Sequence, residues 1–256
     1  MKITAIIQAR TGSTRLPNKV LLQINGRPLL WHVINRLKFS KKIDEIVLAT
    51  TVNPSDDLLE DFAKTNGINY FRGSENDVLD RYYQCAKKYE PDVVIRITAD
   101  CPLIDPEVVD RVVENFIKLK DECDYCANVL PPTFPDGLDT EVFWFKTLEK
   151  AWNEAKYNSE REHVTAYIYK NPDKFKLHNV ANEIDYSGLR WTVDTENDFN
   201  FVKEVYQQIG KDKEIFYMRD ILELLEKKPE LKEINSNSKR NEGYEKSVAE
   251  DKQTSA

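Results

Sequence analysis

The residues with the clearest chemical potential lie in one segment, Gln8–Lys19, directly after the apolar run Ile3–Ile7. This segment contains one glycine, three small hydroxylated residues and three cations. A loop of this kind brings backbone N–H groups and positive charge together, which suits the phosphates of a nucleoside triphosphate. The candidate phosphate-binding residues are Gln8, Ala9, Arg10, Gly12, Ser13, Arg15 and Lys19.

Neither common phosphate-binding motif fits this loop. The P-loop and the dinucleotide-binding fingerprint both need a second glycine, and Gly12 is the only one in the segment. We therefore expect a phosphate-binding loop of another type. The alternative is a surface loop whose cations are merely solvated.

Two aspartates could hold a metal ion beside this loop. Asp100 follows the apolar run Val93–Ile97, and Asp194 follows a shorter apolar stretch, Leu189–Val193. The carboxyl ends of strands in an open α/β sheet face the ligand crevice. Mg²⁺ usually takes one or two protein carboxylates and completes its shell with water and phosphate oxygens, so two aspartates suffice. Asp194 could equally cap the helix expected after it.

Two further groups of polar residues are candidates for substrate contacts. Gly73, Ser74 and Asp77 form a small-residue turn that could contact a base or ribose, or could only connect two elements. A set in the later half could face an acceptor molecule: Asp136, Gly137, Asp139, Glu141, Glu162, His163 and Arg190. As a lone histidine, His163 could instead be a packed structural residue.

The elements that must position these residues follow an α/β pattern. The short apolar runs Ile3–Ile7, Ile43–Ala49 and Val93–Ile97 are typical of buried parallel strands. Helical patterns with start signals alternate with them, at Pro28–Leu37, after Ser55 to about Lys64, after Asn76, and after Asp105-Pro106. This alternation predicts a doubly wound, mostly parallel sheet.

The pattern changes after residue 120, where we expect a substrate-side insertion. A proline-rich segment, residues 131–135, leads into an aromatic strand at Val142–Phe145. The remaining expected elements are helices near Leu148–Tyr157 and Glu160–Lys170, strands near Phe175–Val180 and Leu189–Val193, and a helix from Glu196 to about Ile209.

Composition narrows the class of protein. With 256 residues and 41% hydrophobic content, the chain can bury a sizeable core, which we expect to be a single domain over residues 1–234. Residues 235–256 are polar and predict a disordered tail. The net charge of −7 argues against a duplex nucleic acid partner. No apolar run approaches a membrane span, and no signal peptide is evident, so we expect a cytoplasmic protein without a membrane partner.

The motifs in their order along the chain resemble the spore-coat polysaccharide cytidylyltransferase family (SpsF-like), which is similar to synthetases that join CMP to acidic sugars. The resemblance covers about residues 1–210. It rests on Ile7–Lys19, Gly26–Leu30, Gly73-Ser74 with Asp77–Arg81, Asp100–Pro106, Asp136–Asp139, Arg161–Thr165 and Arg190–Thr195. Ala99 departs from the pattern, because many related synthetases have glycine there.

This resemblance implies a Rossmann-like nucleotidyltransferase that uses CTP and Mg²⁺. Arg10, Arg15 and Lys19 would hold the triphosphate, with Arg10, Lys19 and Asp100 in catalytic roles and Asp100 and Asp194 as metal ligands. The acceptor would be an acidic sugar or a phosphorylated small molecule. Related synthetases are often dimers, so a homodimer is an open alternative.

Three other functions remain as alternatives at this point. A sugar-1-phosphate nucleotidyltransferase for another nucleotide would share the sheet but usually has a more glycine-rich loop. A metal-dependent glycosyltransferase of similar fold would need an Asp-x-Asp pair, which Asp100-Cys101-Pro102 is not. The third alternative is a catalytically silent nucleotide-binding protein.

Overall fold

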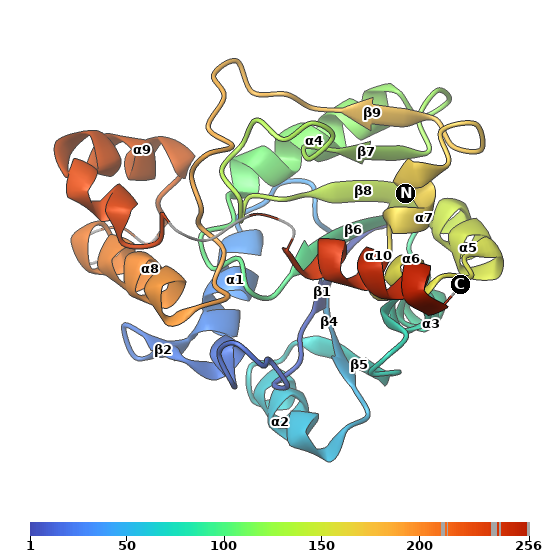
Figure 1. Ribbon diagram of the computed structural model, residues 1–256, viewed down its shortest axis with the longest axis horizontal. Coiled ribbons are helices and arrows are strands. Elements are labelled where there is room, and N and C mark those ends of the chain that lie inside the picture. Colours follow the sequence, from blue (N-terminus) through green and yellow to red (C-terminus); the bar gives the residue numbers. More distant parts are fainter. Residues whose placement is uncertain (211–212, 214, 237–239, 241, 255–256) are drawn as a thin grey trace.

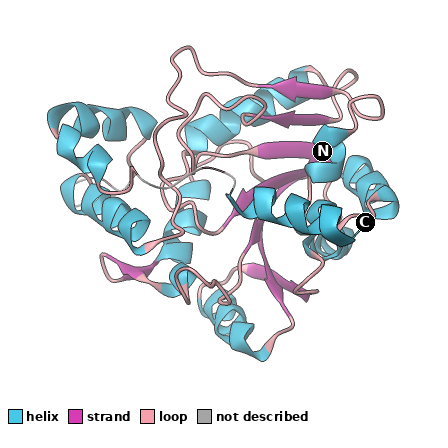
Figure 2. Cartoon of the chain, in the orientation of Figure 1, coloured by secondary structure: helices cyan, strands magenta, loops and turns pink. Residues whose placement is uncertain are grey.

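A seven-stranded sheet runs through the centre of the molecule, with helices around it (Figures 1 and 2). The structure is a computed structural model that describes residues 1–210, 213, 215–236, 240 and 242–254. The strand order is β5-β4-β1-β6-β8-β7-β9. The strands are β1 (Ile3–Gln8), β4 (Glu45–Thr51), β5 (Asn69–Gly73), β6 (Val93–Thr98), β7 (Tyr125–Ala127), β8 (Glu141–Trp144) and β9 (Leu177–Asn179).

The sheet is mostly parallel, as the sequence predicts. Strands β5, β4, β1 and β6 pair in parallel, and β7 pairs in parallel with β9. Strand β8 lies between β6 and β7 and is antiparallel to both. The three strands predicted from apolar runs are confirmed as β1, β4 and β6, and the aromatic strand is confirmed as β8.

Helices cover both faces of this sheet. They are α1 (Leu29–Leu37), α2 (Asp57–Thr65), α3 (Val78–Tyr89), α4 (Pro106–Lys118), α5 (Phe145–Glu154), α6 (Asn158–Glu162), α7 (Ala166–Lys170), α8 (Glu196–Gln208), α9 (Met218–Lys227) and α10 (Glu242–Thr254). Short 3₁₀ helices span Lys19–Leu21, Pro54–Asp56 and Pro229–Glu233. A small hairpin, β2 (Gln23–Ile24) and β3 (Arg27–Pro28), turns at Asn25-Gly26, where both residues have positive φ.

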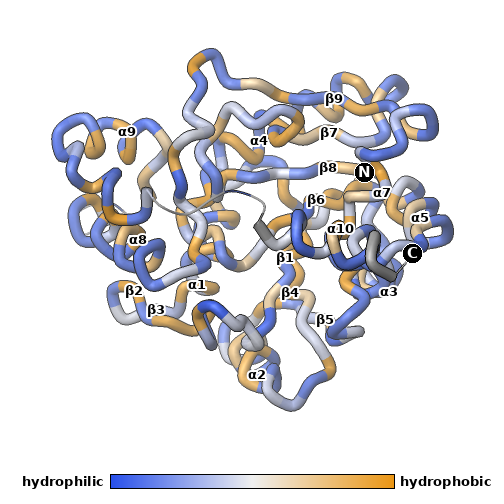
Figure 3. Tube along the Cα trace, in the orientation of Figure 1, coloured by the Kyte–Doolittle hydropathy of each residue, from blue (hydrophilic) through white to orange (hydrophobic). Residues whose placement is uncertain are grey.

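Alternating side chains divide the core into two layers. In β1, Ile7 packs into one cluster with α1, α4 and α8, whereas Ile6 packs into the other with α3 and α5. This alternation is the period of two that a strand imposes. Figure 3 shows the hydrophobic β1 at the centre and the more hydrophilic α10 nearer the surface. The site therefore rests on strands that are packed from both sides.

Several local predictions are wrong. Residues Leu189–Val193 form an extended segment with one isolated bridge, Asp136 to Arg190, instead of a strand of the sheet. Asn53 caps the 3₁₀ turn before α2, because its side chain accepts from Ser55 N. Asp77 caps α3 in place of Asn76, because its carboxylate accepts a hydrogen bond from Asp80 N.

The end of the chain also differs from the expected disordered tail, where the structure describes it. Asn235 is buried, and its amide donates to Asp198 and to the Arg190 carbonyl. Helix α10 lies across the front of the molecule beside α6 (Figure 1). Tertiary contacts fix this polar segment, although its composition offers few apolar residues. Among the described helices, none has the length and apolar character needed to cross a bilayer.

Candidate active site

A cavity of about 940 Å³ opens at the carboxyl ends of β1 and β6. Its walls include the loop after β1, the turn after β5, the start of α3, the end of β6, helix α6, Asp194 before α8, and helix α10. The residues that the sequence assigns to phosphate and metal binding thus share one space with part of the predicted substrate-binding set. Its location agrees with the rule that ligands bind where parallel strands end.

Lys19 joins the predicted metal-binding aspartates. Its ammonium lies 2.8 Å from a carboxylate oxygen of Asp100 and 2.8 Å from one of Asp194. Nζ also donates to the Val193 carbonyl at 2.9 Å. Residues far apart in the chain therefore converge at one point of the cavity.

The electrostatics of this group keep it ionised. Burial by itself would raise the pKa of Asp100. The charge and hydrogen bond of the Lys19 ammonium, with the hydrogen bond from Thr98, together outweigh this effect and lower the pKa of Asp100 to about 2. Burial likewise opposes the charge on Lys19, yet Asp100 and Asp194 raise its pKa above the usual value. At neutral pH the site presents a carboxylate and an ammonium in direct contact.

Hydrogen bonds to Asp56 anchor the loop after β1, and the cations of this loop line the cavity. The Asp56 carboxylate accepts from both the backbone N–H and the hydroxyl of Thr11, each at 2.7 Å. Arg10 is exposed, and the guanidinium of Arg15 lies 3.0 Å from Asp194. A Cβ on Gly12 would meet only a Glu75 oxygen at 3.9 Å, so the space above this glycine is open. The loop thus presents cations to the cavity, and its role in phosphate binding stays a prediction.

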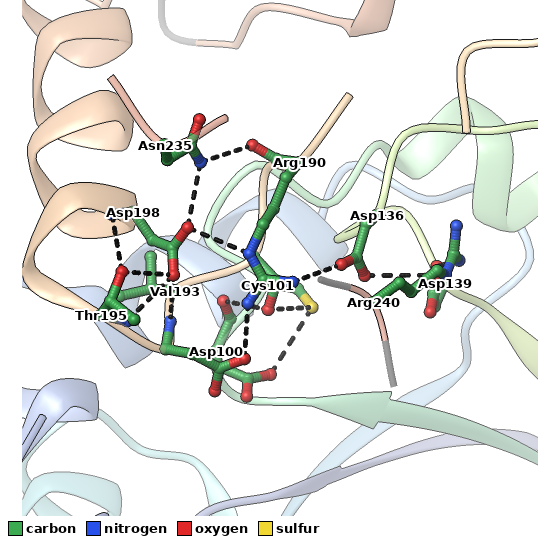
Figure 4. Close-up of polar contacts among 12 residues, drawn as sticks. Asp100, Cys101, Asp136, Asp139, Arg190, Val193, Thr195, Asp198, Asn235 and Arg240 are labelled. Atoms are coloured by element: carbon green, nitrogen blue, oxygen red, sulfur yellow. Dashed lines mark hydrogen bonds and ion pairs between the residues drawn. The ribbon is translucent and has the colours of Figure 1, made fainter. Parts of the chain in front are cut away.

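Arg190 contacts Asp194 from the side away from the cavity, and Figure 4 shows it between Asp136 and Asp198. Its guanidinium contacts Asp136 at 2.7 Å, Asp194 at 2.7 Å and Asp198 at 3.0 Å. Thr195, not Asp194, is the N-cap of α8, and its side chain accepts from Asp198 N. The structure therefore contradicts the alternative that Asp194 caps this helix, and its role as a metal ligand stays a prediction.

The predicted acceptor residues fall into two groups. Glu162 and His163 line the cavity, whereas the other five do not: Asp136, Gly137, Asp139, Glu141 and Arg190. The buried Glu141 contacts Arg96 and accepts from the hydroxyls of Tyr125 at 2.5 Å and Thr165 at 2.6 Å. Asp139 accepts from Arg240 at 2.5 Å. Structural hydrogen bonds thus occupy several residues that the sequence placed near the acceptor.

Of the three residues predicted in the turn after β5, Asp77 lines the cavity, together with its neighbours Glu75 and Asn76, whereas Gly73 and Ser74 do not. Besides capping α3, its carboxylate accepts from the Arg161 guanidinium at 2.6 Å and 2.9 Å. Gly73 and Ser74 lie behind it, and the Ser74 carbonyl accepts from Arg81.

The sequence analysis did not single out several residues of the cavity wall. Arg81, Arg96 and Arg161 contribute cations from α3, β6 and α6, and α10 contributes Gly243, Lys246, Ser247 and Glu250. Arg81 and Arg161 stand inside motifs that were noticed for other reasons, so a signal for them existed. No apolar pattern marks α10, and only its docking on α6 brings it to the site.

The pair Asp100 and Asp194 fits a divalent cation of the Mg²⁺ type. Both carboxylates reach the same Lys19 nitrogen, and carboxylate oxygens are the ligands that Mg²⁺ prefers. Over the described residues, no cluster of three or more His, Cys, Asp or Glu side chains could hold a metal. Two protein ligands are sufficient when phosphate oxygens and water supply the rest.

Comparisons with known proteins identify the fold and the family. The sequence profile of the cytidylyltransferase family matches residues 4–247. Spore coat polysaccharide biosynthesis protein SpsF from Bacillus subtilis is 32% identical over 89% of this chain and 95% of its own. A cytidylyltransferase structure from Leptospira borgpetersenii superposes with a TM-score of 0.87 at 37% identity, over 93% of this chain and 98% of that one.

A more distant structure shares the fold alone. It is a CMP:2-keto-3-deoxy-manno-octonic acid synthetase complexed with CTP, with a TM-score of 0.63 and 18% identity over 81% of this chain and 99% of that one. The mixed sheet and the cavity at its strand ends therefore define a nucleotidyltransferase. More particularly, the chain belongs to the cytidylyltransferase family, as the SpsF-like resemblance predicted. Neither a glycosyltransferase nor a silent nucleotide-binding protein agrees with this class.

Proposed function

We propose that this enzyme transfers CMP from CTP to an acidic sugar or a phosphorylated small molecule, with release of pyrophosphate, for the synthesis of a surface polysaccharide or glycan. The observation that carries the proposal is the contact of Lys19 with both Asp100 and Asp194 at 2.8 Å. The neighbour that was solved with CTP and the SpsF relative support the choice of nucleotide and pathway.

In this proposal the protein mainly positions the reactants and neutralises their charge. Arg10, Arg15 and Lys19 bind the triphosphate and offset the charge that develops on the leaving pyrophosphate. Asp100 and Asp194 would hold Mg²⁺, which when bound would stabilise negative charge at the α-phosphate and lower the pKa of the attacking hydroxyl. Lys19 would then donate to phosphate oxygens in place of the two carboxylates.

Two variants and a control test the roles of these residues. Lys19→Met and Asp100→Asn should each lower turnover by about 10²-fold or more, because each removes a charge that acts at the reacting phosphates. Asp110→Asn is a matched control, since Asp110 of α4 lies outside the cavity lining and its carboxylate accepts from the Ser40 hydroxyl and the Lys41 N–H. The readout is pyrophosphate release from CTP in the presence of Mg²⁺ and the acceptor that the panel experiment below identifies, and a Lys19→Met enzyme with normal turnover would contradict the proposal.

The acceptor is found by a panel experiment. The purified enzyme is incubated with each of the four nucleoside triphosphates, with and without Mg²⁺, and with acidic sugars or phosphorylated small molecules. We expect pyrophosphate release only when CTP, Mg²⁺ and a suitable acceptor are all present. Equal turnover with UTP or GTP would instead favour the alternative of a sugar-1-phosphate nucleotidyltransferase with another base preference.

A further inference from the structure

One side of α10 forms part of the cavity wall, although this helix comes from the end of the chain. The residues of α10 that line the cavity are Gly243, Lys246, Ser247 and Glu250. Their spacing of three, one and three residues places them on one side of a helix. Figure 1 shows α10 beside α6, whose last residue, Glu162, also lines the cavity. The C-terminal helix and α6 therefore face the same space.

The hydroxyl of Ser247 lies between two polar side chains of the cavity. Its Oγ is 2.7 Å from a carboxylate oxygen of Glu162 and 3.1 Å from Nε2 of His163. A hydroxyl has a single proton and can also accept, so it can donate to Glu162 while it accepts from His163. The Gly243 carbonyl, one turn earlier in α10, is an alternative acceptor at 3.0 Å. A hydroxyl of the chain itself thus satisfies the pair Glu162 and His163.

The pair Glu162 and His163 suits a hydroxyl better than an anion. Burial lowers the pKa of His163, although the nearby Glu162 opposes this, so the ring is neutral at neutral pH. A neutral imidazole with its proton on Nε2 supplies a donor, and a carboxylate 3.8 Å from that nitrogen supplies an acceptor. A phosphate or carboxylate group placed there would meet the negative charge of Glu162. This part of the cavity therefore matches the hydroxyl groups of a sugar.

Polar contacts at the surface hold α10 in place. Ser247 is the only buried residue among the described side chains of this helix, and no described residue of α10 belongs to either core cluster. The Tyr244 ring packs edge-on against His163 at 5.0 Å, and the Asp251 carboxylate accepts from Ser159 N at 3.1 Å. Elements with few buried apolar contacts open before the core does. Helix α10 can therefore detach while the sheet stays intact.

We propose that α10 competes with the acceptor for the cavity. The Ser247 hydroxyl takes the place of an acceptor hydroxyl between Glu162 and His163, and the helix is displaced when the acceptor binds. The inference rests on the proposed function and, of the two acceptor classes named there, it favours the acidic sugar, which carries hydroxyl groups besides its charge. Because only molecules with α10 detached bind the acceptor, the apparent affinity for the acceptor falls in proportion to their fraction. Helix α10 is thus an autoinhibitory segment.

Chemical modification of His163 tests, without any substrate, whether α10 covers the pair. Diethyl pyrocarbonate reacts with neutral imidazole nitrogens, and mass spectrometry quantifies the product at each of the 3 histidines of the chain. His178 of β9, which lies outside the cavity lining, is the internal reference. Ser247→Ala should raise the rate at His163 relative to His178 about fivefold, because it removes a hydrogen bond that holds the helix.

The matched control is Glu245→Gln. Glu245 belongs to the same helix, but it is exposed and outside the cavity lining, so its variant should react like the wild type. A melting curve establishes that each variant is folded.

Steady-state kinetics then use the acidic sugar that supports pyrophosphate release in the panel experiment. Ser247→Ala should lower the KM for this sugar about fivefold and leave the KM for CTP unchanged, because more molecules have α10 detached. A third measurement needs no variant. In the wild-type protein, a saturating concentration of the sugar should raise hydrogen exchange in α10 about fivefold or more.

Four results would each overturn the inference. An unchanged rate at His163 in folded Ser247→Ala would show that α10 does not shield the pair. A higher KM for the sugar in this variant would mean that Ser247 helps to bind the acceptor, and a change in the KM for CTP alone would assign the pair to the nucleotide. Slower exchange in α10 with the sugar would make the helix a lid that closes over the substrate. Failure of the proposed function would look different, because no compound of the panel would then support pyrophosphate release, whereas His163 would still become more reactive in Ser247→Ala.

Discussion

Replacing Gly137 with alanine should damage the site from a position outside the cavity. Gly137 has a φ of +109°, and a Cβ there would lie 2.7 Å from the backbone of both Trp191 and Thr192. The same region carries backbone bonds from Asp136 N to the Leu189 carbonyl and from Trp191 N to the Asp136 carbonyl. The missing side chain thus allows two backbones to approach next to Asp194.

The size of the effect follows from two contributions. A residue other than glycine in such a backbone conformation costs about 1–3 kcal/mol. Forcing a methyl group into a packed region costs about 1–3 kcal/mol more, and here the colliding atoms are backbone, which cannot turn away as a side chain could. We expect Gly137→Ala to lower the free energy of unfolding by about 4 kcal/mol.

Gly26→Ala separates these contributions. Gly26 has a φ of +76°, but nothing lies within 4 Å of its added Cβ, so only backbone strain of about 1 kcal/mol should appear. Urea unfolding measures both variants, and pyrophosphate release measures their activity. Gly137→Ala should also lose activity at temperatures where it is folded, because Arg190 and Asp194 follow the displaced backbone. Equal stability of the two variants would refute this reasoning.

Three further predictions concern other parts of the structure. Arg96→Met should lower the free energy of unfolding by about 3–5 kcal/mol in urea titrations, because it leaves the buried Glu141 without its cation; a loss below about 1 kcal/mol would contradict this. Burial lowers the pKa of His32, so the unfolded chain binds more protons than the native one below about pH 6.5, and stability is lost as the pH falls from 6.5 toward the lowered value. His32→Gln should reduce that slope in unfolding curves between pH 5 and 7. Ser247→Ala removes the 2.7 Å bond to Glu162 and should raise hydrogen exchange in α10 about fivefold, while exchange in α4 stays unchanged.

The sequence was most informative where local pattern and tertiary role coincide. The run Ile3–Ile7 is apolar because β1 is buried between two layers, and the same burial brings its carboxyl end to the crevice. Asp100 could be placed near Lys19 because parallel strands end at one edge of a sheet, and their contact at 2.8 Å agrees with that rule.

Side-chain partners were less predictable, because a carboxylate looks the same in a sequence whether it serves a ligand or a structural contact. Glu141 was expected near the acceptor, yet the antiparallel β8 pairs it with Arg96 inside the sheet. The position of β8 between β6 and β7 depends on pairing between strands that are far apart in the sequence. The local pattern of apolar and polar residues does not reveal which strands pair. Helix α10 was missed for a related reason, since Ser247 and its neighbours dock on α6 through polar contacts.

The arrangement of charges around Asp194 links stability to function. Arg190 neutralises the negative charge of three aspartates from the side away from the cavity. Lys19 and Arg15 contact Asp194 from the cavity side. The rear contacts are largely buried, so they can keep the carboxylate in place while its cavity-side partners change. In the proposed reaction, Lys19 and Arg15 would donate to phosphate oxygens instead of to Asp194. Asp194 therefore does not need to move for the site to pass from its ion-paired form to its nucleotide-bound form, which is the preorganisation that phosphoryl chemistry requires.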